Sequence, residues 1–92
     1  MALYLHNNNG DVQVKVGAGK LKGIFVSVAS GSPTLTVYDT ATASTSDPVI
    51  LAVFTPAANT MYLLSGDEGG IFFSRGLWVD KGGTVNCTIF YE

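Results

Sequence analysis

Apolar and polar residues alternate with a period of two along most of this chain. Val12, Val14 and Val16, for example, are separated by Gln13 and Lys15. Successive side chains of a β-strand point to opposite faces, so this period predicts strands with one buried side and one side toward solvent. We predict strands over residues 2–6, 11–16, 20–29, 34–39, 48–55, 60–65, 71–74, 77–80 and 84–91.

Clusters of Gly, Asn, Ser and Pro separate these segments, at 7–10, 17–19, 30–33, 66–70 and 81–83. Such residues favour turns because they tolerate or preset the backbone angles that turns need. The longest predicted loop runs from Thr40 to Asp47, and we expect Asp39 to accept backbone hydrogen bonds at its start. No segment shows a convincing helical period of apolar residues. The sequence therefore predicts an all-β chain.

The chain of 92 residues has the length of one domain, and we interpret residues 1–92 as a single β domain. Short strands separated by frequent turns are typical of sandwiches and barrels. We predict a single antiparallel β-sandwich, jelly-roll-like, or a squat barrel, with about eight strands. Cys87 is the only cysteine, which excludes disulfides, and its phase with Val85 and Ile89 predicts that it is buried.

The surface of this domain is predicted to be poor in charge. Charged residues make up 13% of the chain, against about 25% in an average soluble domain. Weakly charged, partly apolar surface is typical of buried interfaces. We therefore expect a homo-oligomer or a protein docked on a larger assembly, with a soluble monomer covered by Ser and Thr as the alternative.

Several functional classes lack support in the sequence. The five basic residues are scattered, whereas nucleic acid binding needs a concentrated basic surface. No apolar run approaches the ~20 residues of a membrane span. The first residues lack the features of a signal peptide, and a free cysteine fits synthesis in the cytoplasm. We expect no nucleic acid and no membrane among the partners.

Catalytic chemistry is not predicted either. His6 is the only histidine, and we interpret it as a turn residue that makes ordinary hydrogen bonds. Asp67 and Glu68 are adjacent in a glycine-rich turn, without the regular spacing of oxygen ligands that a calcium loop has. We assign no catalytic residue, no metal and no cofactor, and predict that the chain is not an enzyme.

Aromatic residues are the candidate interaction residues. Phe25 and Phe90 lie opposite the aliphatic faces of their predicted strands, and Ile71-Phe72-Phe73 is apolar on both faces. A strand that is apolar on both faces is covered on both sides, and in so small a domain the second cover is expected to come from another chain. The predicted interface residues are Phe25, Phe72 or Phe73, and Phe90.

Three stretches carry a resemblance. They read GIFVSV at 23–28 with TLTVYDTATAS at 34–44, GIFFSRGLWVD at 70–80, and GTVNCTIFY at 83–91. Together they resemble small virion structural proteins of tailed bacteriophages. The resemblance implies a location in the virion after synthesis in the host cytoplasm, and a non-enzymatic capsid-decorating, head–tail joining or tail-associated role. It also favours a homotrimer that binds capsid or tail proteins.

Carbohydrate binding is the alternative function. Sugar sites combine an exposed Trp or Tyr with acidic, amide or Arg side chains, and Trp78, Asp80 and Arg75 fit that composition. For the structural role, we expect the loop Thr40 to Asp47 and the turn Ser65 to Gly70 to reach a partner, because loops tolerate the sequence changes that recognition requires.

Overall fold

The computed structural model describes residues 3–64 and 70–92, and over these residues it contains strands and no helix. All strand pairs are antiparallel, in one sheet of seven strands, which confirms the all-β antiparallel prediction. The strands are β1 (Leu3–Asn7), β2 (Val12–Val16), β3 (Gly19–Tyr38), β4 (Val49–Phe54), β5 (Thr60–Leu63), β6 (Ile71–Phe73) and β7 (Gly76–Tyr91).

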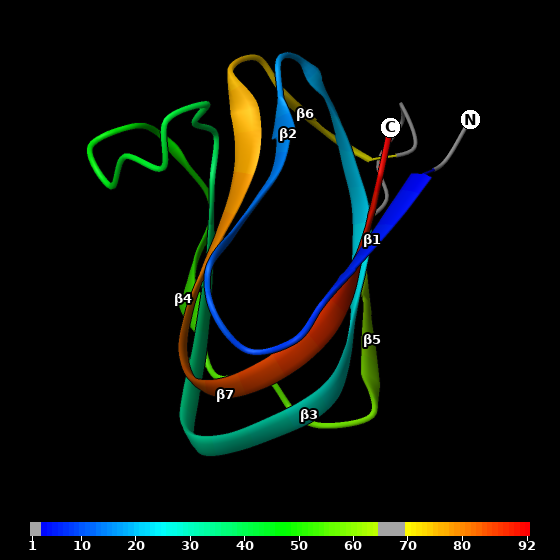
Figure 1. Cartoon of the computed structure of the whole chain (residues 1–92). Helices are drawn as coiled ribbons and strands as arrows, with labels where there is room; N and C mark the ends of the chain where they lie inside the picture. Colours follow the sequence, from blue (N-terminus) through cyan, green and yellow to red (C-terminus); the bar gives the residue numbers. More distant parts are fainter. Residues whose placement is uncertain (1–2, 65–69) are drawn as a thin grey trace.

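Two long strands, β3 and β7, form the centre of the sheet and pair with each other along most of their length. Each was predicted as two strands with a turn between, at 30–33 and at 81–83. That prediction is wrong, because both segments bend without reversing direction. Ser30 pairs with Thr84 and Thr34 pairs with Gly82, so a β-bulge lies between these two pairs. Figure 1 shows both strands bending together at the bottom of the view.

Residues with a positive φ make this bend possible. Gly31, Ser32 and Gly83 have φ values of 67°, 56° and 67°. A Cβ atom at Gly83 would lie 2.5 Å from the carbonyl oxygen of Gly31. Glycine is thus required at position 83 by a close backbone approach as well as by its backbone angle. The segments 30–33 and 81–83 do contain residues that favour turns, but in the structure they form a bend within a continuous strand.

The bend folds the sheet into two halves that face each other. One half contains β1, the C-terminal part of β7, the N-terminal part of β3, β5 and β6. The other contains β2, the N-terminal part of β7, the C-terminal part of β3, and β4. The two halves enclose the core, with the edge residues Phe54 and Tyr62 in contact at 5.3 Å between ring centroids. The buried core residues are Val14, Leu21, Ile24, Val26, Leu35, Val37, Phe73, Leu77, Val79, Val85, Cys87 and Ile89.

The loop between β1 and β2 is hydrogen-bonded to the bend of β7. Asp11 Oδ1 accepts the backbone N–H of Lys81 at 2.8 Å, and Asn9 Oδ1 accepts that of Val85 at 3.3 Å. The buried Lys81 Nζ donates to the carbonyl oxygens of Asn8 and Val85, both at 3.2 Å. β2 pairs with β7 only up to Val79 and β1 only from Cys87 on, so these bonds satisfy backbone groups of the bend that neither strand reaches. The predicted turn at 7–10 therefore also stabilises the corner.

Candidate functional site

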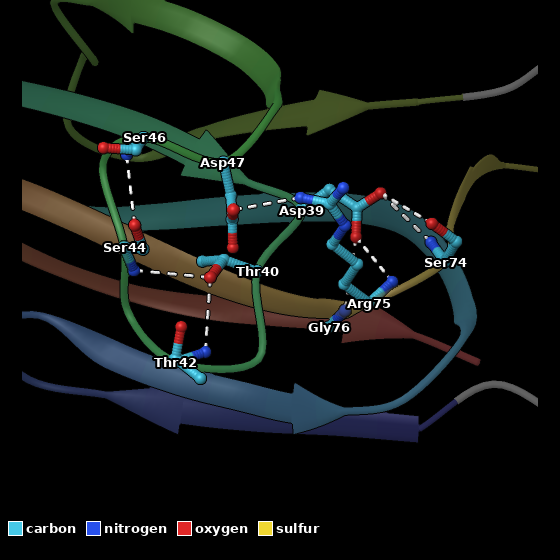
Figure 2. A network of polar contacts seen from close by, with 9 residues as sticks. All are labelled: Asp39, Thr40, Thr42, Ser44, Ser46, Asp47, Ser74, Arg75 and Gly76. Atoms are coloured by element: carbon cyan, nitrogen blue, oxygen red, sulfur yellow. Dashed lines mark hydrogen bonds and ion pairs between the residues drawn. The ribbon is translucent and has the colours of Figure 1, made fainter.

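The Asp39 carboxylate holds the start of the loop between β3 and β4 to the chain at 74–76. Asp39 accepts hydrogen bonds from the backbone N–H groups of Ser74, Arg75 and Gly76 at 3.1, 2.8 and 3.2 Å, and from Ser74 Oγ at 3.3 Å. Figure 2 shows both carboxylate oxygens directed at this segment. Partial burial opposes ionisation, but the backbone hydrogen bonds outweigh it and hold the pKa of Asp39 below its usual value. The prediction that Asp39 accepts backbone hydrogen bonds is confirmed, although the donors lie at 74–76 and not in the loop that Asp39 precedes.

The rest of this loop is ordered by its own hydroxyl groups (Figure 2). Thr40 is fully buried, and its Oγ1 accepts the N–H groups of Thr42 and Ser44 at 3.2 and 3.3 Å. Ser44 Oγ accepts the N–H of Ser46, and Asp47 forms an ion pair with Arg75 at 2.9 Å. Ser and Thr side chains that bond local backbone stabilise a turn. Many polar groups of this loop therefore already have partners within the chain.

Three edge strands of the sheet lack charged residues and expose apolar side chains. In the described part of the chain, β1, β4 and β5 each pair with a single neighbour, β7 or β3. None of the three contains Asp, Glu, Lys or Arg. They carry most of the exposed large apolar side chains: Leu3, Tyr4, Val49, Val53, Met61 and Leu63, with exposed fractions of 46, 72, 50, 64, 42 and 74%. Free strand edges in soluble proteins usually carry charge, proline or a bulge that prevents further pairing. The pairing of β4 with β3 is irregular at two places, whereas the registers of β1 and β5 are regular.

Phe25 and Phe90 lie on the outer face of the half that contains β1 and β5. Directly paired residues of neighbouring strands point to the same face, so the registers define two rows across this face. The rows are Tyr4, Phe90, Gly23 and Leu63, and next to it His6, Thr88, Phe25 and Met61. Neither row contains Asp, Glu, Lys or Arg. Phe25 and Phe90 are half-buried and continue the apolar surface of the edge strands across the sheet.

The two phenylalanines of β6 differ in their exposure to solvent. Phe72 is 65% exposed, whereas Phe73 is fully buried in the core. Phe73 therefore stabilises the fold, and Phe72 is the member of the pair that is accessible to a partner. Phe72 lines a depression of about 290 Å³ together with Lys15, Ala18, Gly19, Lys20 and Glu92.

The structure does not provide a sugar-stacking surface at the residues considered for carbohydrate binding, which are Trp78, Asp80 and Arg75. Trp78 is only 8% exposed and packs against Tyr38, with 5.2 Å between ring centroids. A sugar ring stacks on an accessible aromatic face, which Trp78 lacks. Burial raises the pKa of Asp80, and the neighbouring Asp11 carboxylate raises it further. Arg75 is engaged with Asp47.

Two residues with reactive side chains have structural partners. His6 was interpreted as a turn residue, but it lies within β1. Its hydrogen bonds are ordinary, as expected: its Nδ1 is 3.0 Å from Thr88 Oγ1 and its Nε2 is 3.2 Å from Asn8 Oδ1. Cys87 is fully buried, as predicted. Burial raises the pKa of its thiol, an effect that the ammonium group of Lys81 opposes in part.

The exposed residues of the edge strands β4 and β5 were not predicted to be interaction residues. The run Val49-Ile50-Leu51-Ala52-Val53-Phe54 is apolar on both faces and follows Pro48. Proline in a sheet is confined to edges, strand starts and bulges. Proline at the start of this strand is compatible with an edge position but does not require one, because any strand start tolerates proline. The turn Ser65 to Gly70, predicted to reach a partner, lies outside the described residues except for Gly70.

Over the described ranges, no helix has the length and apolar character needed to cross a membrane, and no group of three or more His, Cys, Asp or Glu is placed to hold a metal ion. Comparison with protein-family models, with curated proteins and with solved structures finds no match to this chain. The resemblance to virion proteins thus rests on the sequence motifs at 23–44, 70–80 and 83–91.

Proposed function

We propose that this protein is a non-enzymatic structural component of a bacteriophage virion, which self-associates and docks on a capsid or tail assembly. The observation that carries the proposal is the set of charge-free edge strands β1, β4 and β5 with their exposed apolar side chains. The virion assignment is supported by the motif resemblance.

Exposure of these apolar strands to water has a free-energy cost. Burial of apolar surface contributes about 25 cal/mol per Å², and an unpaired strand edge adds backbone groups that a partner strand can satisfy. A monomer with this surface gains from association at several places at once. Repetition of the protein over a symmetric shell or tail strengthens weak individual contacts through avidity.

The polar loop contributes less to such docking than its position suggests. Thr40, Ser44 and Asp47 are already bonded within the loop or to Arg75. A partner that binds this loop must replace bonds that exist, whereas a partner that covers Val53 or Leu63 displaces only water. The apolar edges are therefore the primary contact surface.

Two measurements test the proposal. Light scattering on the purified protein is expected to give a multiple of the 9.7 kDa chain, with a trimer favoured by the resemblance. Virion particles assembled without the protein are expected to bind it when mixed and sedimented. A monomeric mass at micromolar concentration contradicts the self-association, and absence from the sedimented particles contradicts the virion role.

A further inference from the structure

The loop between β1 and β2 contains Asn9, which is exposed to solvent and is followed directly by Gly10. We propose that Asn9 is a site of spontaneous deamidation, at which the amide nitrogen of Gly10 displaces ammonia from the Asn9 side chain. The same side chain contacts the bend of β7, because its Oδ1 accepts the backbone N–H of Val85 at 3.3 Å. The modification therefore alters a contact that supports the fold, and it weakens the attachment of the loop.

The reaction consumes water and needs no other reagent. The backbone nitrogen of Gly10 loses its proton to solvent base and attacks Cγ of Asn9. The bond from Cγ to Nδ2 breaks, and the departing nitrogen takes up a proton from solvent and leaves as ammonia. Asparagine is a thermolabile residue, and the ring closure is fast for an uncatalysed step because both reacting groups belong to one chain segment.

Water then opens the cyclic imide at one of its two carbonyl carbons. Addition of water at Cγ of residue 9 restores the original main chain and leaves aspartate. Addition at the main-chain carbonyl carbon leaves isoaspartate, in which the chain continues through Cγ. In both cases an amide and water have become a carboxylate and ammonia, and no electrons are transferred.

The geometry around Gly10 leaves the attacking nitrogen accessible. Gly10 has a φ of 113°, which is a region for glycine, and apart from its chain neighbours no heavy atom lies within 4 Å of where a Cβ atom would be. Over the part of the chain that the structure describes, its carbonyl accepts from Asn7 Nδ2 at 2.9 Å, whereas its N–H donates to no protein group. The nucleophile is therefore neither covered by a side chain nor held by an acceptor.

The other asparagines of the chain lack this combination. Each of them is followed by a residue with a Cβ atom, which hinders closure of the imide ring: these are Asn7, Asn8, Asn59 and Asn86. Asn86 also lies within β7, whose main chain is paired with β3. Asn9 is the position at which the following residue and the local structure both favour the reaction.

The two products affect the bend differently. Aspartate at position 9 keeps an oxygen that accepts the N–H of Val85, although it adds a negative charge close to Asp11. Isoaspartate inserts a methylene carbon into the main chain before Gly10, which displaces Asp11 from the Lys81 N–H that it accepts at 2.8 Å. A backbone group that loses its partner lowers stability. Protein that carries isoaspartate is therefore expected to be less stable than the Asn9→Asp variant.

Incubation of the purified protein at mildly alkaline pH tests the site. Wild-type protein is expected to release ammonia, and peptide fragmentation in a mass spectrometer is expected to locate aspartate and isoaspartate at position 9. Asn9→Gln is expected to lose this release, because its longer side chain closes a larger ring more slowly. Asn8→Gln is the matched control: it leaves the pair Asn9-Gly10 intact and is expected to react at the wild-type rate.

The same incubation in urea separates the effect of the fold from that of the sequence. If the unfolded chain is modified at Asn9 and the native protein is not over the same time, the fold protects this residue and the proposal is overturned. Modification of Asn7 or Asn8 in place of Asn9 overturns it as well. The urea midpoint of aged native protein is expected to fall below those of fresh protein and of Asn9→Asp, and an unchanged midpoint contradicts the weakened attachment of the loop.

Discussion

The loop at 39–48 and strand β4 are consecutive in the chain, and their surfaces differ in kind. The loop is rich in Ser, Thr and Asp, and hydrogen bonds of Asp39, Thr40 and Ser44 hold it in place. Strand β4 has no polar side chain, and its Val49 and Val53 lie exposed next to an edge that no described strand pairs. The polar groups of the loop are thus bonded within the chain, although its sequence suggests an accessible surface. Strand β4 has the sequence of a core strand, but some of its side chains are exposed to solvent.

This difference shows that exposure alone does not identify a binding segment. A polar group that already has a good partner gains little from another one, because binding only exchanges hydrogen bonds. An exposed apolar side chain gains free energy from any cover that removes it from water. The loop therefore acts as a structural clamp, and β4 remains available for association.

The largest expected effect is a difference in stability between substitutions on the buried and the exposed side of β4. Phe54 packs on the core and contacts Tyr62, so Phe54→Ala is expected to lower the free energy of unfolding by about 2–3 kcal/mol. Val53→Ala, on the exposed face, is expected to change it by less than about 0.5 kcal/mol. Urea denaturation of both variants measures this difference. Equal destabilisation by the two substitutions would mean that Val53 belongs to the core.

Removal of the Asp39 carboxylate tests the clamp. Asp39→Ala leaves the N–H groups of Ser74, Arg75 and Gly76 without their acceptor, and a loss of about 2 kcal/mol in unfolding free energy is expected. Cleavage by a protease within residues 40–47 is expected to accelerate, while the mass in light scattering stays that of wild type. A change in oligomer mass would instead assign the loop to the interface.

Acid is expected to weaken the same clamp. The pKa of Asp39 is lowered in the folded protein, so its carboxylate contributes stability that is present above its unfolded pKa of about 3.9. That contribution is lost as the pH falls through the lower folded value. Urea denaturation at a series of pH values between neutral and about pH 3 measures this loss. The free energy of unfolding is expected to decrease less with falling pH for Asp39→Asn than for wild type. Parallel curves would show that other carboxylates dominate acid sensitivity.

The smallest effect is expected at the ion pair of the loop. Arg75 and Asp47 lie 2.9 Å apart, with side-chain exposures of 53 and 27%. Partly exposed pairs contribute about 0.2–1 kcal/mol and are screened by salt. Arg75→Gln is expected to lower stability by an amount within that range, and the difference from wild type is expected to shrink in high salt. A larger, salt-independent loss would indicate that Arg75 supports the loop by packing.

Part of the fold followed from local patterns. Alternation at Val12, Val14 and Val16 predicted β2, and the phase of Cys87 with Ile89 predicted its burial. The turn chemistry at 30–33 and 81–83 was also recognised, but the reversal inferred from it was wrong. Gly and Ser at positive φ permit both a hairpin turn and a bulged corner. Pairing between β3 and β7, distant in sequence, decides which of the two forms.

The candidate interaction surface was also predictable only in part. The sequence by itself determined an all-β chain, poor in charge, with apolar residues on both faces of some strands. Only the tertiary structure decided that Phe73 is core and Phe72 is exposed, because burial depends on which half of the bent sheet lies opposite. Likewise, VILAVF is equally suited to a central or an edge strand. Its place at the end of the sheet is a property of strand order, which arises from long-range pairing that no local pattern encodes.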